Sequence, residues 1–146
     1  MKVTLKQELN KELEVIIIYP RRDDFVDQIE TYINMLSQVI PITHNNQTVT
    51  IPIRDICYIE TVDRKVFVYT NDQIFQSNKK LFQLELELKN YGIRKVNKCC
   101  LVNVAKLKAI KNVHNSRLEA QLSNGEKIQV SRTYISNIRK GLLLVE

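Results

Sequence analysis

The feature that most limits the fold is a series of short, strand-like segments, separated by polar turns, that begins near residue 39. The expected strands are 39–43, 49–53, 56–60, 66–70, 73–76, 94–97, 100–102, 107–112, 117–122 and 127–130. Short runs with many β-branched residues between turn-forming residues are typical of sheet proteins. The sequence therefore predicts a mainly β (α+β) fold with one or two short helices.

The two helices of this β region have recognisable ends. Ser77 or Asn78 can cap the first helix, and Gly92 supplies a left-handed stop after an apolar stripe of leucines at 81, 84 and 88. Ser131 is expected to cap the second, which carries the apolar residues Tyr134, Ile135, Ile138 and Leu142.

A hairpin is expected at Asn124-Gly125, and its loop length follows from the faces of the two strands. A two-residue loop would put the two apolar rows on opposite faces of the hairpin. A three-residue loop, with Gly125 left-handed, pairs Ala120 with Ile128 and places both rows on one face. We therefore expect the three-residue loop.

A small β-α segment is expected before the β region. Residues 13–19 have the β-branched composition of a buried strand that ends at Pro20, and apolar residues at spacings of three and four predict a helix over 23–38. This gives an N-terminal appendage over 1–41 and a second domain over 42–146. The appendage is too short for a phosphoacceptor receiver domain, and three roles stay open for it: packing, a dimer contact or contact with a signalling partner.

The charge distribution favours a polyanionic ligand for the second domain. Residues 1–50 hold 5 Lys/Arg and 7 Asp/Glu, a net of −2, whereas residues 51–146 hold 17 and 9, a net of +8. A positive field of this kind attracts nucleic acid or an anionic membrane surface, although many basic domains are merely soluble. No apolar run reaches the length of a membrane span and no secretion signal is visible, so we expect a cytoplasmic protein without membrane insertion.

The sequence offers little for catalysis or metal binding. Cys57, Cys99 and Cys100 lack a C-x-x-C spacing, and adjacent cysteines on a strand point to opposite faces. We expect three reduced and mostly buried thiols, no metal site, no cofactor and no catalytic residues. Without an acid/base pair or triad, the chain is not expected to be an enzyme.

Several short motifs, in this order and spacing, carry a family resemblance. They are Ile56-Cys57-Tyr58-Ile59-Glu60-Thr61-Val62-Asp63-Arg64-Lys65, the leucine helix, Val96-Asn97-Lys98-Cys99-Cys100-Leu101-Val102-Asn103, Asn124-Gly125-Glu126 and Val130-Ser131-Arg132-Thr133-Tyr134. Over about residues 42–142 the chain resembles the LytTR-type DNA-binding domain of bacterial transcriptional regulators. The resemblance implies an elongated antiparallel β fold whose loops, rather than a helix, enter successive major grooves of bent duplex DNA.

The resemblance also implies which residues contact DNA. Base or phosphate contacts are expected from Arg64 and Lys65, from Asn97 and Lys98, and from Arg132 and Thr133. Lys79, Lys80, Lys106 and Arg139 are candidates for phosphate contacts, which add affinity without sequence information. Each basic turn has the alternative of being an ordinary solvated turn. Relatives commonly have Ser and an aromatic residue where this chain has Cys99-Cys100, which removes a good hydroxyl donor.

These observations lead to a regulator that binds specific double-stranded DNA, with a homodimer on repeated sites and a signalling partner protein as further expectations. The alternative is a basic β module for RNA or single-stranded nucleic acid, which would need exposed aromatic platforms. Asn103, at the end of an apolar strand, is expected to hold a turn rather than to read DNA.

Overall fold

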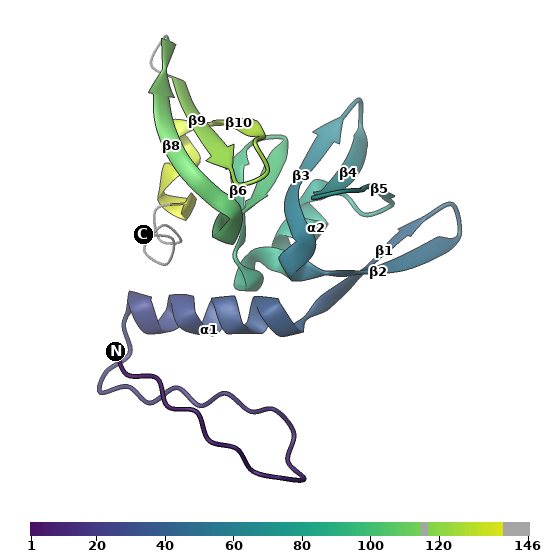
Figure 1. Ribbon diagram of the computed structural model, residues 1–146. Helices are drawn as coiled ribbons and strands as arrows, with labels where there is room; N and C mark the ends of the chain where they lie inside the picture. The colour runs from purple at the N-terminus through teal and green to yellow at the C-terminus, as the bar shows by residue number, and fades with distance from the viewer. Residues whose placement is uncertain (115–116, 139–146) are drawn as a thin grey trace.

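The computed structural model describes residues 1–114 and 117–138 (Figure 1). The first helix is α1 (Asp24–Ser37), and the second is α2 (Leu81–Leu88). The strands are β1 (Val39–His44), β2 (Gln47–Pro52), β3 (Ile56–Val62), β4 (Lys65–Thr70), β5 (Ile74–Ser77), β6 (Ile93–Asn97), β7 (Cys100–Asn103), β8 (Leu107–Val113), β9 (Arg117–Leu122) and β10 (Lys127–Val130). Short 3₁₀ turns are η1 (Ile53–Asp55), η2 (Lys89–Tyr91), η3 (Val104–Lys106) and η5 (Arg132–Tyr134). The mainly β class is confirmed.

The strands form two sheets and a separate hairpin, all with antiparallel pairing. The larger sheet has five strands in the order β5-β4-β3-β7-β6, the smaller has the order β10-β9-β8, and β1 pairs with β2. Figure 1 shows the three-stranded sheet beside the five-stranded one, with α1 lying across the opposite end from most hairpin tips. The two sheets thus pack together through a shared core, and α1 lies across one end of the molecule.

The central strands β3 and β7 of the five-stranded sheet are buried on both faces, which explains the near-continuous apolar sequence of β3. Ile56 and Ile59 pack in a core with α2, the β1–β2 hairpin and Met35 of α1. Cys57 and Tyr58 face a second core shared with the three-stranded sheet. Two adjacent residues face the same core because the β3–β4 register shifts between Ile56 and Tyr58, as a β-bulge produces.

The hairpin and the first helix agree with their sequence predictions. Ala120 pairs with Ile128 and Leu118 with Val130, so the three-residue loop is confirmed, and Gly125 has φ 92°. Asp23 caps α1 through its carboxylate, which accepts from the Val26 N–H at 2.9 Å. Gly92 stops the α2–η2 segment with φ 81°.

Three local predictions need correction or fall outside the structure. Lys80, rather than Ser77 or Asn78, occupies the N-cap of α2, and its N–H donates to the Gln83 side chain. Ser131 occupies the N-cap of η5, but its side chain makes no capping bond. Residues 135–138 are helical as expected, whereas Leu142 lies outside the described residues.

The strand predicted over residues 13–19 is wrong. Residues 1–22 contain neither helix nor strand, and Leu13 and Ile18 are 98% and 92% exposed. A strand needs a partner for its backbone groups, and no described segment forms a β-bridge with these residues. Strand-like composition here lacks the pairing that would make it a strand.

No described helix is long and apolar enough to cross a membrane.

Candidate nucleic-acid interface

The first of the three basic turns is the tight connection between β3 and β4. Val62 pairs with Lys65, so only Asp63 and Arg64 form the loop, and both have positive φ, at 52° and 67°. Two left-handed residues in a two-residue loop are typical of a type I′ hairpin turn. The guanidinium of Arg64 and the ammonium of Lys65 therefore project from the tip of a rigid strand pair.

The second basic turn, between β6 and β7, is held by the side chain of Asn97. Its Nδ2 donates to the Gln129 carbonyl at 2.7 Å, and its Oδ1 accepts from the Cys99 N–H at 2.8 Å. The first bond reaches β10 and the second closes the turn around Lys98. Asn97 thus positions an exposed Lys98 against the three-stranded sheet, using its own carbonyl and amide for contacts within the protein.

The third basic turn is η5, which follows β10 and carries the exposed residues Arg132 and Thr133. The Ser131 N–H donates to the Val96 carbonyl at 2.8 Å, so η5 begins beside β6. The Lys95 ammonium lies 5.4 Å from the centre of the Tyr134 ring, within the range of a cation–π contact. These contacts fix the position of Arg132 and Thr133 relative to Lys98.

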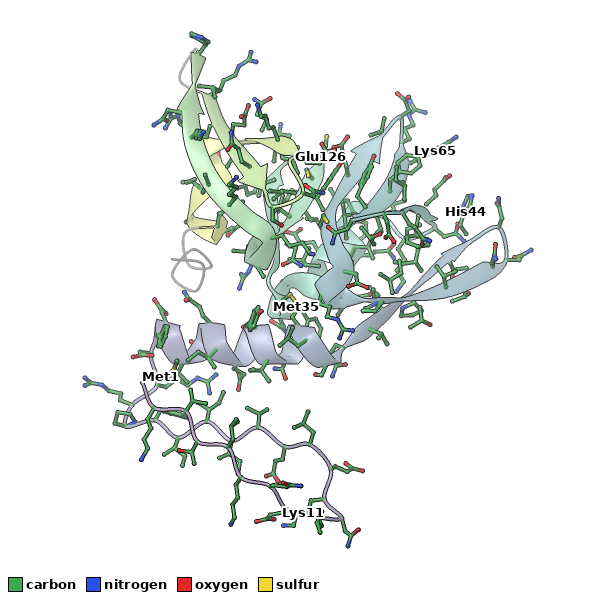
Figure 2. All side chains as sticks on the ribbon, in the orientation of Figure 1. Met1, Lys11, Met35, His44, Lys65 and Glu126 are labelled. Atoms are coloured by element: carbon green, nitrogen blue, oxygen red, sulfur yellow. The ribbon has the colours of Figure 1, made fainter. Side chains whose placement is uncertain are left out.

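The three turns are connected through the ends of their strands. Besides the contacts around Asn97 and Ser131, the Thr61 N–H near the end of β3 donates to the Cys99 carbonyl at 2.8 Å. In Figure 1 the tips of β3–β4 and β6–β7 lie at the end of the molecule away from α1, and Figure 2 labels Lys65 at the β3–β4 tip. All six predicted contact residues therefore belong to one connected set of turns.

The four phosphate-contact candidates lie in different surroundings. The Lys79 ammonium binds both carboxylate oxygens of Glu87 at 2.7 and 2.9 Å. Lys80 begins α2, and Lys106 belongs to η3, where its carbonyl accepts from the Ser123 N–H. Arg139 lies outside the described residues. None of the described three shares the hydrogen bonds that connect the basic turns.

The structure also presents basic residues that the sequence prediction did not select. Lys111, Arg117 and Lys127 are exposed on the outer face of the three-stranded sheet, because Leu118, Ala120 and Ile128 occupy its inner face. Lys108 is exposed on β8 as well. Only the net charge of residues 51–146 indicated them, since alternating strand faces become a surface only after the pairing register is known.

Behind the turns, the two sheets bury groups that resist ionisation. Burial, followed by the neighbouring Glu60, raises the pKa of the Cys100 thiol well above its ordinary value. Burial and Glu126 do the same for the Tyr58 phenol, whose ring stacks on Tyr69 with 4.2 Å between ring centres. Cys57 and Cys100 are buried as predicted, whereas Cys99 is exposed at the β6–β7 turn. The core between the two sheets, behind the basic turns, therefore contains uncharged thiol and phenol groups.

Asn103 has the structural role predicted for it. Its side chain is fully buried, its Nδ2 donates to the Ile56 carbonyl at 2.8 Å, and its Oδ1 accepts from the Ala105 N–H at 3.0 Å. The first bond joins the end of β7 to the start of β3, and the second caps η3. Among the described residues, no group of three or more His, Cys, Asp or Glu could hold a metal ion.

Basic turns gathered at one end of an antiparallel β protein form a surface suited to a polyanion such as nucleic acid. The family of LytTr DNA-binding domains matches residues 46–142. A solved LytTr DNA-binding domain from Bacillus cereus has a TM-score of 0.62 and 25% identity to this chain, and the match covers 73% of this chain and 97% of that one. The chain belongs to the LytTR family of DNA-binding domains.

Curated relatives agree with this assignment. The chain is 24% identical over 106 residues to the sensory transduction protein LytT of Enterococcus faecalis, and 32% identical over 92 residues to that of Bacillus subtilis. The matches cover 73% and 63% of this chain but only 44% and 38% of the two relatives. The chain therefore spans less than half of these relatives.

Proposed function

We propose that this chain is a cytoplasmic transcriptional regulator that reads a specific duplex sequence by placing its basic turns in the major groove. Arg64, Lys65, Lys98, Arg132 and Thr133 supply the contacts. Asn97, which was expected to contact DNA as well, acts here by holding the turn that presents Lys98. Lys or Arg can donate to guanine O6 and N7, and each good pair discriminates by about 1 to 3 kcal/mol. Nothing in the proposal requires catalysis or a cofactor.

The connection between the second and third turns is the observation that carries this proposal. Asn97 bonds to the Gln129 carbonyl and Ser131 to the Val96 carbonyl, so Lys98 and Arg132 come from turns that are fixed to each other. Side chains on rigidly connected turns keep a constant distance from each other, so they can contact neighbouring base pairs at the same time. Two independent solvated turns would have no such common frame.

We assign DNA reading to residues 42–146 and a supporting role to residues 1–41. The net charge supports this division, because the positive excess lies entirely after residue 50. The N-terminal part would serve packing, a homodimer on repeated sites or contact with a signalling partner. Residues 1–22 are the part of it that the structure leaves most exposed.

Binding of RNA or single strands is the alternative, and the two aromatic residues that stack between β3 and β4 weigh against it. Tyr58 is 8% exposed and stacks on Tyr69 between the two sheets. A base-stacking platform needs aromatic faces open to solvent. Competition of duplex DNA against single-stranded DNA and RNA of the same sequence separates the two functions.

Selection of bound duplexes from a random pool tests the proposal directly. We expect a defined motif for the wild type, and for Lys98→Ala and Arg132→Ala a relaxed preference at one or two positions with a loss of about 1 to 3 kcal/mol on the best site. Lys127→Ala, which removes an equal charge from the outer sheet face, is the control and should keep the same motif. If both turn variants fold and retain the full motif, readout by these residues is wrong.

A further inference from the structure

The N-terminal arm, residues 1–22, gathers many exposed apolar side chains. Val3, Leu5, Leu9, Leu13, Ile16 and Ile18 are between 71% and 98% exposed. Figure 1 shows the arm as two antiparallel limbs beneath α1, and Figure 2 labels Lys11 at the turn between them. The limbs meet in a turn at Leu9 and Asn10, and neither limb forms a strand or a bridge with another described segment. The arm thus combines exposed apolar side chains with unpaired strand-like backbone.

The second limb of the arm has one open face. Val15 and Tyr19 are 55% and 42% exposed and Ile17 is half-buried, whereas Ile16 and Ile18 are 71% and 92% exposed. Alternate residues of an extended chain point to opposite sides. One side of this limb is therefore partly covered within the chain, and the Ile16–Ile18 side has no cover.

Helix α1 adds an apolar stripe near the same end of the molecule. Phe25, Tyr32 and Leu36 are 42%, 44% and 38% exposed, and the half-buried Ile29 falls between them at helical spacing. Spacings of four, three and four place these residues along one side of the helix. Other residues of α1 contact the β region. Met35, for example, packs in its core and is 4% exposed.

The charges of the arm are complementary to the arm itself. The first limb carries Lys2, Lys6 and Glu8, whereas residues 12–19 of the second limb carry only the acidic Glu12 and Glu14. Arg21 and Arg22 follow this stretch, and Arg22 binds Asp27 and Glu30 of α1. Ion pairs within the arm join Lys6 and Lys11 to Glu8, at 3.0 and 3.1 Å, and Lys2, Glu12 and Glu14 form no ion pair with the described residues. Two antiparallel copies of the arm would bring a basic limb against an acidic limb twice.

We propose that the N-terminal arm pairs with the same arm of a second copy of this chain, and that this pairing completes the strand over residues 13–19. A two-fold interface uses the same patch on both subunits, so a self-complementary patch is what it requires. Pairing would satisfy the backbone groups of both arms and cover the Ile16–Ile18 face. It would turn an unpaired, strand-like segment into part of an intermolecular sheet.

The position of the arm suits two copies that both bind DNA. The arm and α1 lie at the end of the molecule away from the β3–β4 and β6–β7 tips (Figure 1). A dimer formed there leaves the basic turns of both copies open. The inference gives the homodimer of the proposed function its surface, and it rests on that function only for this last point.

The mass of the full chain in solution, measured by light scattering without DNA, tests the pairing. We expect twice the 17.1 kDa of one chain for the wild type at micromolar concentration, and the mass of one chain for the double variant Ile16→Glu, Ile18→Glu. The control Ile74→Glu puts the same change on β5, where the side chain is 63% exposed, and should stay dimeric. A monomeric wild type, or a double variant that stays dimeric, would overturn the proposal.

A charge exchange identifies the two limbs as the pairing elements. Lys2→Glu with Lys6→Glu makes both limbs acidic, and Glu12→Lys with Glu14→Lys makes both basic. Each variant alone should dimerise about tenfold more weakly, because like charges then face each other. An equimolar mixture should recover wild-type affinity as a mixed dimer, detected with a mass tag on one chain. Recovery only of self-dimers would contradict the pairing.

The result is separable from the test of DNA reading. The Ile16→Glu, Ile18→Glu variant keeps every basic turn, so its selected DNA motif should retain the same bases within a single site. Loss of dimer with an unchanged motif supports both proposals. A normal dimer with no duplex preference would refute the proposed function and leave the pairing intact.

Discussion

Two segments of similar composition, residues 13–19 and β3, have opposite fates in this protein. Both are short and dominated by β-branched and aromatic residues, yet Ile59 of β3 is fully buried and Ile18 is 92% exposed. Strand β3 lies between β4 and β7 and has a core on each face. Residues 13–19 have no neighbouring strand among the described residues. The difference teaches that β-type composition becomes a strand only where partners supply hydrogen bonds and burial.

Truncation of one isoleucine in each segment should give the largest difference. Ile59→Ala leaves a cavity between β3 and α2 and should lower the free energy of unfolding by about 2 to 5 kcal/mol. Ile18→Ala removes an exposed side chain and should change it by less than about 0.5 kcal/mol at concentrations where the chain is monomeric. Urea denaturation of both variants measures this. Equal losses would mean that the two segments are equally packed.

The buried amide of Asn103 tests how far β3 depends on contacts beyond its own strand pairing. Asn103→Ala leaves the Ile56 carbonyl and the Ala105 N–H without their side-chain partners, and the cost should be about 1 to 3 kcal/mol. Asn112→Ala on the exposed part of β8 is the matched control and should be nearly neutral. If the two variants unfold at the same urea concentration, the bonds of Asn103 contribute nothing measurable.

Alkaline pH should destabilise the β region through groups that the arm does not contain. Burial raises the pKa of Cys57, Cys100 and Tyr58 in the folded state above their ordinary values of 9.0 for a thiol and 10.0 for a phenol. The unfolded chain loses these protons first, so their contribution is complete below about pH 9 and is lost as pH rises. The free energy of unfolding should therefore fall above about pH 9.

Removing one of these groups sharpens the test. Cys100→Ala should lower the free energy of unfolding at neutral pH because it removes buried atoms, but the decline above about pH 9 should become shallower. Guanidinium titrations at several pH values measure the slope. An unchanged slope would assign the alkaline loss to other groups.

The smallest expected effect concerns two exposed lysines that differ in whether they have an ion-pair partner in the protein. Lys79 already binds Glu87, whereas Lys127 makes no ion pair with the described residues. If Lys127 contacts a phosphate, Lys127→Ala should reduce the salt slope of DNA binding by about one, and Lys79→Ala should reduce it by less. Affinity measured over a series of salt concentrations gives both slopes. Glu87→Gln, which releases Lys79, should strengthen binding slightly, and a weaker complex would contradict this account.

Much of the β region could be predicted because its local patterns agree with its tertiary contacts. The register of β9 and β10 followed from the requirement that Ala120 and Ile128 share a face, and α1 followed from its apolar spacing and the cap Asp23. The bulge at Cys57 was not predictable from the sequence. It places Ile56 in one core and both Cys57 and Tyr58 in the other, and these cores exist only in the folded chain.

The residues of the candidate site could be predicted from the sequence, but the hydrogen bonds that hold its turns together could not. The sequence pointed to Lys98 and Arg132 through a family resemblance, and the contacts of Asn97 with Gln129 and of Ser131 with Val96 join residues more than 30 positions apart. Lys79 illustrates the converse, since its partner Glu87 is separated from it by most of α2. Only the folded chain shows which charges are paired.

The sequence by itself determined the mainly β class, the turns and the excess of positive charge after residue 50, because these depend on local chemistry and composition. The tertiary structure decided which apolar segments became strands and which basic residues share one surface. The physical reason is the same in both cases. A backbone N–H, an apolar side chain and a charge are each stabilised by what lies next to them, and neighbours distant in sequence are chosen only when the chain folds.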